Sequence, residues 1–342
     1  MKVSVVILNW NGCDMLRTFL PSVVRYSKGE GIEVCVADNG STDDSVALLQ
    51  QEFPSVRTIV LDQNYGFADG YNLALQQVDA EYVVLLNSDV EVTEHWLEPM
   101  VAYLDAHPEV AACQPKIRSQ RQKEYFEYAG AAGGFIDKYG YPFCRGRIMG
   151  VVEKDEGQYD TVIPVFWATG AALFIRRTDY VNVGGLDGRF FAHMEEIDLC
   201  WRLRSRNREI VCVPQSIVYH VGGATLKKEN PHKTFLNFRN NLVMLYKNLP
   251  QEELNKVMRI RTCLDYLAAF NFLLQGHWDN ASAVMRARKE YKRLCPSFSL
   301  SREENMRKKT LNPIPERTKS SILWQFYARG CKRFSQLSDL KG

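Results

Sequence analysis

The sequence offers little that could hold it in a membrane or export it. The longest apolar stretch of the tail, residues 263–274, is broken by Asp265 and Asn271 and is shorter than the roughly 20 apolar residues of a spanning helix. The chain starts directly with the strand-like run at residues 3–8, and no basic region followed by a long apolar segment precedes it. We therefore expect neither a transmembrane helix nor a signal peptide.

Cysteine pairs are also missing, although the chain has nine cysteines. None of them forms a Cys-x-x-Cys pair, and Cys35, Cys113 and Cys212 sit within apolar runs. This usage is typical of small core residues in a reducing compartment and excludes a disulfide framework or a zinc site of that spacing. We expect a cytoplasmic protein, with peripheral contact at the cytoplasmic membrane face as an open alternative.

Charge is nearly balanced overall but unevenly distributed. The 342 residues carry a net charge of +3. Residues 1–250 hold 25 Lys and Arg against 31 Asp and Glu, whereas residues 251–342 hold 18 against 9. A basic tail on an acidic body indicates either attraction to an anionic surface or an ordinary solvated face. We find no nucleic-acid-binding module and expect no nucleic-acid partner.

Four strand-like runs, each followed by a helical pattern, occupy the first hundred residues. The runs are residues 2–9, 33–37, 56–61 and 82–86. Such alternation predicts an α/β fold, with a mostly parallel central sheet covered by helices.

Polar residues follow these runs at once. They are Asn9, Asp38, the turn at 64–72 with Gly66 and Gly70, and Asn87 with Asp89. Ligands bind at the carboxyl ends of strands in open α/β sheets, so these residues are candidates for a phosphate and metal site. Turn formation and helix capping are the structural alternative. The turn at 64–72 lacks the Gly-x-Gly-x-x-Gly pattern, which argues against a dehydrogenase.

Chemistry in the second half is concentrated in two places. Glu195, Glu196 and Asp198 stand at the start of an amphipathic helix, where the helix dipole favours carboxylates whatever their function. Arg202 is placed to pair with Asp198, which leaves Glu196 as a candidate general base. His220 precedes Gly-Gly-Ala-Thr and is either structural or a metal ligand.

Two further stretches are harder to interpret. Residues 118–160 show no confident element and are expected to form a functional loop or a mobile segment. Residues 165–177 form an apolar run with a Thr-Gly pair at its centre, which indicates either a buried strand with a bulge or close passage by a bound sugar.

In order, these motifs resemble the inverting family 2 glycosyltransferases, and more narrowly the rhamnosyltransferase-like branch that builds bacterial surface polysaccharides. The resemblance covers about residues 2–245, and its motifs are specific as an ordered set. They are Ile7-Leu-Asn-Trp-Asn-Gly12, Ala37-Asp-Asn-Gly-Ser-Thr-Asp43, Asn64-Tyr-Gly-Phe-Ala-Asp-Gly70, Leu86-Asn-Ser-Asp89, Gly184-Gly-Leu-Asp187, Glu195-Glu-Ile-Asp-Leu-Cys200 and His220-Val-Gly-Gly-Ala-Thr225.

The resemblance implies a GT-A-type fold, a nucleotide-diphosphate sugar donor, and a divalent cation such as Mg²⁺ or Mn²⁺. It implies that Asp89 and His220 bind the metal and that Glu196 is the base, with Glu195 and Asp198 as alternatives. The implied acceptor is a glycan or a polyprenyl-linked glycan. The residues implied to bind the nucleotide sugar are Asn9, Asp38, Asn64, Gly66, Phe67, Asn72, Asn87 and Thr225.

Two positions depart from the family pattern. Asn87 replaces the first Asp of the Asp-x-Asp signature, which leaves Asp89 as the main acidic metal ligand. The base position reads Glu195-Glu196 where the family usually has Glu-Asp. The additional methylene displaces the carboxylate by about an ångström unless the backbone compensates, and such a displacement can cost roughly a hundredfold in rate.

The tail, residues 246–342, is predicted to be a basic helical extension of a catalytic domain at residues 1–245. Its segment 306–333 mixes basic groups with Trp324 and Tyr327. This composition indicates a membrane-surface helix, a helical cap on the catalytic domain or a dimer contact. A sugar-phosphate nucleotidyltransferase and a nucleotide-sugar-binding protein with impaired catalysis remain alternative functions.

Overall fold

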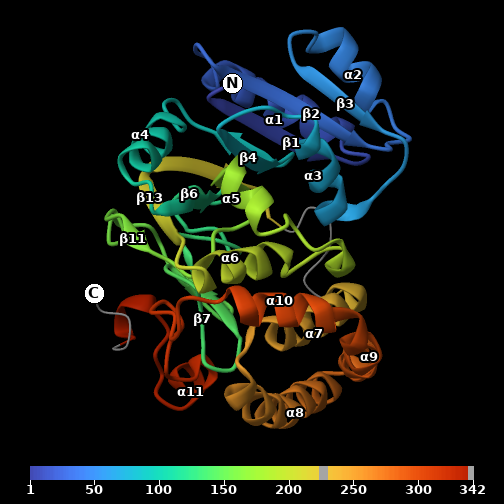
Figure 1. The fold of residues 1–342 in the computed structure, drawn as a ribbon, viewed down its shortest axis with the longest axis vertical. Helices are drawn as coiled ribbons and strands as arrows, with labels where there is room; N and C mark the ends of the chain where they lie inside the picture. The colour runs from blue at the N-terminus through green and yellow to red at the C-terminus, as the bar shows by residue number, and fades with distance from the viewer. Residues whose placement is uncertain (223–229, 338–342) are drawn as a thin grey trace.

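A nine-stranded sheet forms the centre of the protein in the computed structural model, which describes residues 1–222 and 230–337 (Figure 1). Its strands follow the order β11-β13-β6-β12-β4-β1-β2-β3, and β5 pairs with β13. The strands are β1 (Val3–Asn9), β2 (Ile32–Asn39), β3 (Arg57–Leu61), β4 (Tyr82–Asn87), β5 (Val90–Val92), β6 (Val110–Ser119), β11 (Ile163–Pro164), β12 (Ala172–Arg176) and β13 (Glu209–His220).

The first four strands are parallel and are confirmed where the sequence predicts them. β1 pairs with both β2 and β4, and β2 pairs with β3, all in parallel. Side chains alternate between the two faces along each strand. Thus Val5 joins the core on one face of the sheet and Val6 the core on the other.

Helices cover both faces of the sheet. The core that contains Val5 includes residues from α1 (Cys13–Tyr26), α2 (Ser45–Glu52) and α4 (Glu98–Ala106). The core that contains Val6 includes residues from α3 (Gly66–Gln76), α5 (Arg177–Asn182) and α6 (Glu195–Ser205). Because the helices enclose the sheet, its strand ends are left as the accessible edge for a ligand.

The expectation that residues 118–160 contain no regular element is wrong. Four short strands there form an antiparallel sheet in the order β10-β9-β8-β7. The strands are β7 (Gly134–Ile136), β8 (Pro142–Cys144), β9 (Arg147–Ile148) and β10 (Val151–Val152). With two or three residues each, they are too short for an alternating pattern to show in the sequence.

The strand expected across residues 165–177 is shorter than that run. β12 begins at Ala172, so Thr169 and Gly170 precede the strand and do not form a bulge within it. β12 is antiparallel to both β4 and β6. This places the Thr-Gly pair at the same edge of the sheet as the carboxyl end of β4.

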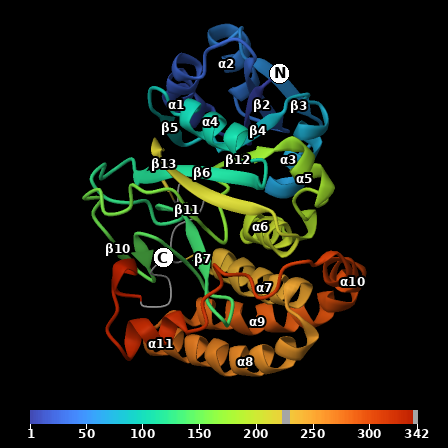
Figure 2. The same ribbon diagram turned by 60° about the vertical axis from the view of Figure 1, so that its left-hand side comes forward.

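Helices dominate the remainder of the chain and stack below the sheet, with α8 outermost (Figure 2). No helix of the described residues is long and apolar enough to cross a membrane. All nine cysteines are free. The helices are α7 (Pro231–Asn248), α8 (Gln251–Leu274), α9 (Trp278–Leu294), α10 (Ser299–Lys308) and α11 (Ile322–Tyr327), with short 3₁₀ turns at Gly188–Phe190, Cys295–Phe298 and Phe334–Gln336.

The end of the tail packs against the body of the protein. Ile322, Phe326 and Phe334 belong to the apolar core that contains Val6. Trp324 and Tyr327 remain exposed. This packing supports the cap alternative for much of segment 306–333. Helix α7 spans residue 245, and a division of the chain at that point stays a prediction.

Candidate active site

Two polar side chains meet at the carboxyl ends of β1 and β2. Asn9 and Asp38 are register partners, and Asn9 Nδ2 donates to Asp38 Oδ1 at 3.1 Å. The backbone N–H of Ser41 donates to the other oxygen of Asp38 at 2.9 Å. Both side chains are buried, and Asn9 Oδ1 has no protein partner. The pair is therefore held in a fixed position with one free acceptor.

Gly12 lets the following turn approach this pair. A Cβ atom at Gly12 would lie 2.4 Å from Asn9 Oδ1 and 3.8 Å from Ser88 Oγ. Only glycine can occupy this position without displacing Asn9. The ends of β1 and β4 are thus close together, since Leu8 also pairs with Asn87 across the sheet. Asn87 donates its backbone N–H to the carbonyl of Ala171.

The turn at residues 64–66 is fixed by a residue that sequence reasoning missed. Asn39, the last residue of β2, donates through Nδ2 to Asn64 Oδ1 at 3.1 Å and to the Gly66 carbonyl at 3.0 Å. Its Oδ1 accepts from the N–H of Tyr65 at 3.0 Å. Its place beside Asp38 at a strand end was the available signal.

Asn72 lies on α3 and holds a different loop. Its Oδ1 accepts from Tyr180 Oη at 2.6 Å and from the Leu186 N–H at 3.1 Å, and its Nδ2 donates to the Leu186 carbonyl at 2.8 Å. The side chain therefore joins α3 to the loop after α5. These bonds occupy both of its polar atoms within the protein.

Asp89 and His220 are brought together by the pairing of β5 with β13. His220 Nε2 lies 3.1 Å from Asp89 Oδ1, and its Nδ1 lies 3.6 Å from Glu127 Oε2. All three residues are buried. Burial lowers the pKa of His220, but the bonds and charges of Asp89 and Glu127 outweigh burial and raise it to about 10.

Glu127 is a second residue that sequence reasoning missed. It belongs to the stretch in which the sequence shows no confident element. A Cβ atom at Gly222 would lie 2.5 Å from Glu127 Oε1, so the glycine after His220 makes room for this carboxylate. The Gly-Gly pair that follows His220 was the available signal.

The donor atoms of this cluster suit a hard divalent cation. Among residues 1–222 and 230–337, no three His, Cys, Asp or Glu side chains are grouped to hold an ion alone. Mg²⁺ commonly takes one or two protein ligands and completes its shell with substrate phosphates and water. Asp89 and His220 fit that smaller number of ligands, because a carboxylate and an imidazole nitrogen already lie 3.1 Å apart.

Glu195 and Glu196 begin α6, and each retains one buried oxygen without a partner. Burial raises the pKa of both carboxyls, and the charge of Glu196 raises that of Glu195 further. Glu196 lies close to Gly170 and to Phe67, which follows the turn at residues 64–66. A Cβ atom at Gly170 would lie 3.3 Å from Phe67 Cζ and 3.8 Å from Glu196 Cβ. Glycine at position 170 keeps this space open.

Asp198 is occupied by structural contacts. It pairs with Arg202 at 2.9 Å, as the spacing predicts, and also with Lys247 Nζ at 2.8 Å. Asn248 Nδ2 donates to its second oxygen at 2.8 Å. Asp198 is fully buried, and these bonds join α6 to α7.

The loop before Glu195 has a strained backbone that a single amide holds in place. Phe191, His193 and Met194 have φ angles of 65°, 69° and 75°. Asn240 Nδ2 on α7 donates to the carbonyls of Phe190, Ala192 and His193 at 3.0, 2.7 and 2.8 Å. Strain of this kind, maintained by surrounding contacts, is common at functional sites.

The loop before Glu195 also contacts the turn at residues 64–66 and the residue that follows it. The N–H of Phe67 donates to the Phe191 carbonyl at 3.2 Å. A Cβ atom at Gly66 would lie 3.0 Å from the Phe191 ring, and that ring is half-exposed at the edge of the site. Thr225, the remaining residue implied by the resemblance, lies outside the described residues.

Comparison with known proteins agrees with this arrangement. Residues 4–171 match the family described as "Glycosyl transferase family 2". The chain is 27% identical over 231 residues to the O-antigen biosynthesis protein RfbC of Myxococcus xanthus, covering 67% of this chain and 18% of that protein. It is also 27% identical over 230 residues to the N-acetylglucosaminyl-diphospho-decaprenol L-rhamnosyltransferase of Mycobacterium tuberculosis, covering 63% of this chain and 75% of that enzyme.

Solved structures show the same fold. GalNAc-T7, crystallised with UDP, GalNAc and Mn²⁺, aligns with a TM-score of 0.59 at 15% identity, over 93% of this chain and 59% of that one. Staphylococcus aureus TarS 1–349 in complex with UDP-GlcNAc aligns with a TM-score of 0.55 at 15% identity, over 90% of this chain and 89% of that one.

The sheet, its strand-end residues and these similarities define a glycosyltransferase with a GT-A-like fold and C-terminal helices. Within that class, residues 4–171 form a glycosyltransferase family 2 domain. The chain is also similar to proteins named as rhamnosyltransferases. One of them is WbbL of Escherichia coli, which is 24% identical over 227 residues.

Proposed function

We propose that this enzyme transfers a sugar from a nucleotide diphosphate to a hydroxyl of a glycan, with inversion at the anomeric carbon. The observation that supports this most strongly is Glu196, a carboxylate with a free oxygen beside Gly170 and Phe67. A base at this position is close to the turn that would hold the donor. Its raised pKa suits proton removal near neutral pH.

The chemical step is a single displacement. Glu196 accepts the proton of the acceptor hydroxyl while that oxygen forms a bond to the anomeric carbon. The bond from that carbon to the diphosphate breaks on the opposite side, and its electron pair remains on the phosphate oxygen. Burial keeps the pKa of Glu196 and of its neighbour Glu195 raised, and the charge of Glu196 raises that of Glu195 further.

Binding of the nucleotide is assigned to the strand-end residues. Asp38 and Asn9 would face the nucleoside, and the turn at Asn64 and Gly66, held by Asn39, would lie along it. Asn87 ends β4 next to these groups. The fixed hydrogen bonds among them lower the entropic cost of positioning the donor.

A divalent cation held by Asp89 and His220 would supply Lewis-acid stabilisation of the diphosphate charge. His220 binds a metal only in its neutral form, so ion binding would release the proton that the two carboxylates now stabilise. Mn²⁺ in the crystals of GalNAc-T7, which shares the fold, is consistent with this assignment.

The acceptor class is proposed from the similarity to the Mycobacterium tuberculosis enzyme, whose name specifies a decaprenol-diphosphate-linked sugar. A polyprenyl-linked glycan is the corresponding acceptor here, with rhamnose as the first sugar to test in the synthesis of a surface polysaccharide. Such an acceptor would bring the enzyme to the cytoplasmic membrane face.

The test is an assay of nucleotide diphosphate release with UDP-, GDP- and dTDP-sugars, Mn²⁺ and a short-chain polyprenyl-diphosphate N-acetylglucosamine acceptor. Release that requires both the acceptor and one nucleotide class would support the proposal. Metal-dependent binding of a donor without release to any glycan acceptor would favour the alternative of a binding protein with impaired catalysis. Release of pyrophosphate from a nucleoside triphosphate and a sugar phosphate would favour the nucleotidyltransferase alternative.

A further inference from the structure

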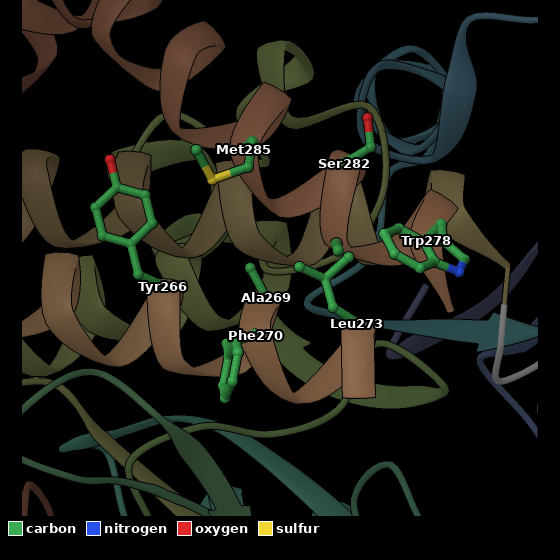
Figure 3. A pocket seen from close by; sticks show the side chains of 8 residues that line it. Tyr266, Ala269, Phe270, Leu273, Trp278, Ser282 and Met285 are labelled. Carbon is green, nitrogen blue, oxygen red and sulfur yellow. The ribbon is translucent and has the colours of Figure 1, made fainter. Parts of the chain in front are cut away.

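The outer face of α8 and α9 is apolar and open to solvent. A groove of about 460 Å³ lies between the two helices, lined by side chains from both (Figure 3). Leu274 and Trp278 are 71% and 70% exposed, far more than large apolar side chains of a packed core. The exposed apolar side chains of this face are Tyr266, Leu267, Phe270, Leu273, Leu274, Trp278 and Met285.

Exposed positive charge is confined to one end of this face. Arg288 on α9 bonds Asp265 and Thr262 on α8, which fixes how the two helices align. Lys289, next to Arg288, therefore lies on the side of that contact from which α8 runs back to Arg259 and Lys256, and Trp278 at the start of α9 lies towards Leu274 at the end of α8. From residue 256 to 289 the exposed charged side chains are Lys256, Arg259, Asp279, Arg286 and Lys289, and Asp279 is the one acid among them.

An apolar tip followed by a basic band is the arrangement that binds an anionic bilayer. Aromatic and aliphatic side chains enter the boundary between headgroups and acyl chains, and Lys and Arg behind them meet the anionic headgroups. A second copy of this chain is a poorer match, because a two-fold contact would place Lys256, Arg259 and Lys289 either next to their own copies or against the apolar tip of the other copy. The first arrangement brings like charges together, and the second buries charges against apolar side chains, so both weaken association.

We propose that the α8–α9 face, defined by the seven apolar residues above, docks on a membrane containing anionic phospholipids. This inference deepens the membrane contact proposed for the acceptor and names the surface that makes it. The segment first suspected from sequence, 306–333, is a different surface, because its Ile322 and Phe326 are buried in the protein core.

Docking through this face would act on the side of the molecule that holds the base. α9 packs on α7, and Asn280 on α9 donates to Thr234 on α7 at 3.1 Å. The same helix α7 carries Asn240, which holds the loop before Glu195. One helix layer therefore connects the proposed membrane face with the loop that positions Glu196.

The test is co-sedimentation of the full-length protein with vesicles of phosphatidylcholine alone or with phosphatidylglycerol. We expect binding to the anionic vesicles that weakens in 0.5 M NaCl, and a fall of about tenfold or more in binding for Phe270→Ser combined with Trp278→Ser. Both side chains are exposed, so this double variant should keep the wild-type melting temperature. Trp324→Ser, at an equally exposed tryptophan outside the face, is the matched control.

Lack of binding to anionic vesicles by the wild-type protein would overturn the proposal. Equal loss in the Trp324→Ser control would also overturn it, because that result would assign binding to segment 306–333. Light scattering could instead detect concentration-dependent dimers that the double variant abolishes. That result would overturn the proposal, because it would show that the α8–α9 face binds a second copy of the chain. None of these measurements needs a donor, so failure here leaves the transfer reaction standing, and failure of nucleotide release leaves the vesicle result standing.

Discussion

Three carboxylates begin α6, and their partners separate their roles. Asp198 bonds Arg202, Lys247 and Asn248, so it holds helices together. Glu196 has an oxygen that no protein group satisfies. A buried acceptor without a partner costs about 1–3 kcal/mol, and a reaction that uses it explains why it is kept.

Glu196→Gln should keep donor affinity and lower turnover by several orders of magnitude, because the amide cannot accept the acceptor proton. The measurement is nucleotide release under saturating donor, with donor affinity from calorimetry. Asp198→Asn is a contrasting variant, which should lower the melting temperature because it removes the carboxylate that pairs with Arg202 and one of the two that pair with Lys247. Near-normal turnover in Glu196→Gln would move the base role to Glu195.

The raised pKa of Glu196 predicts the pH dependence of catalysis. A base must be unprotonated to act, so kcat/KM should fall as the pH drops through a pKa that lies above that of an ordinary glutamate. Burial raises the pKa of Glu196, and Glu195→Gln keeps that burial, so this variant should leave the acid limb in place. Glu94→Gln, at an exposed glutamate, is the control and should also leave it in place. An acid limb that moves to lower pH in Glu195→Gln would show that the charge of Glu195 also contributes to the pKa of Glu196.

Which site residues can be predicted from sequence depends on how far away their partners are. Asp38, Asn87 and Asp89 each end a strand or follow one directly, so local pattern and sheet topology suffice to place them. Asn39, Glu127 and Asn240 act on segments 25 to 93 residues away, and no local period encodes such contacts.

At the scale of elements, the loop from Phe190 to Met194 links the turn at residues 64–66 to Glu196, the proposed base. It receives the N–H of Phe67 on one side and three bonds from Asn240 on the other. The positive φ angles within it cannot be foreseen from Phe, His and Met, which rarely adopt them. Packing by α7, a later element, maintains this conformation.

Asn240→Ala should release this loop and lower kcat about 10- to 100-fold with a smaller change in KM for the donor, since Asn240 bonds the loop that precedes Glu196 and is not among the residues proposed to bind the nucleotide. Steady-state kinetics separates the two constants. Asn237→Ala is the matched control, because Asn237 lies one turn earlier on the same helix and, within residues 1–222 and 230–337, its side chain donates to the Lys233 carbonyl alone. Equal effects of the two substitutions would show that Asn240 only stabilises helix α7 and does not act through the loop before Glu195.

At the scale of the whole molecule, the tail completes the core of the catalytic domain. Glu316 accepts three bonds from Arg204 on α6, and both side chains are buried. Asp137 and Glu153 in the small-sheet region accept the N–H groups of Ile322 and Phe334. The sequence predicts helices there but not their docking, because each contact spans more than a hundred residues.

Glu316→Ala should lower the free energy of unfolding by about 3–5 kcal/mol, because it leaves the buried Arg204 without its partner. Denaturant unfolding measures the change. Glu304→Ala breaks an exposed pair with Lys308 and should cost at most about 0.5 kcal/mol. A loss for Glu316→Ala no larger than that of the control would mean that the tail is held by apolar contacts alone.

The proposed function depends on a nucleotide diphosphate and a cation that meet at Asp89. Calorimetric titration of UDP, GDP and dTDP into the protein, with and without Mn²⁺, tests this most directly when it is repeated with Asp89→Ala. We predict that one nucleotide binds the wild-type protein only when the metal is present, and that the variant stays folded but loses this binding. Equal affinity with and without metal, or in the variant, would contradict a metal-dependent donor site at Asp89.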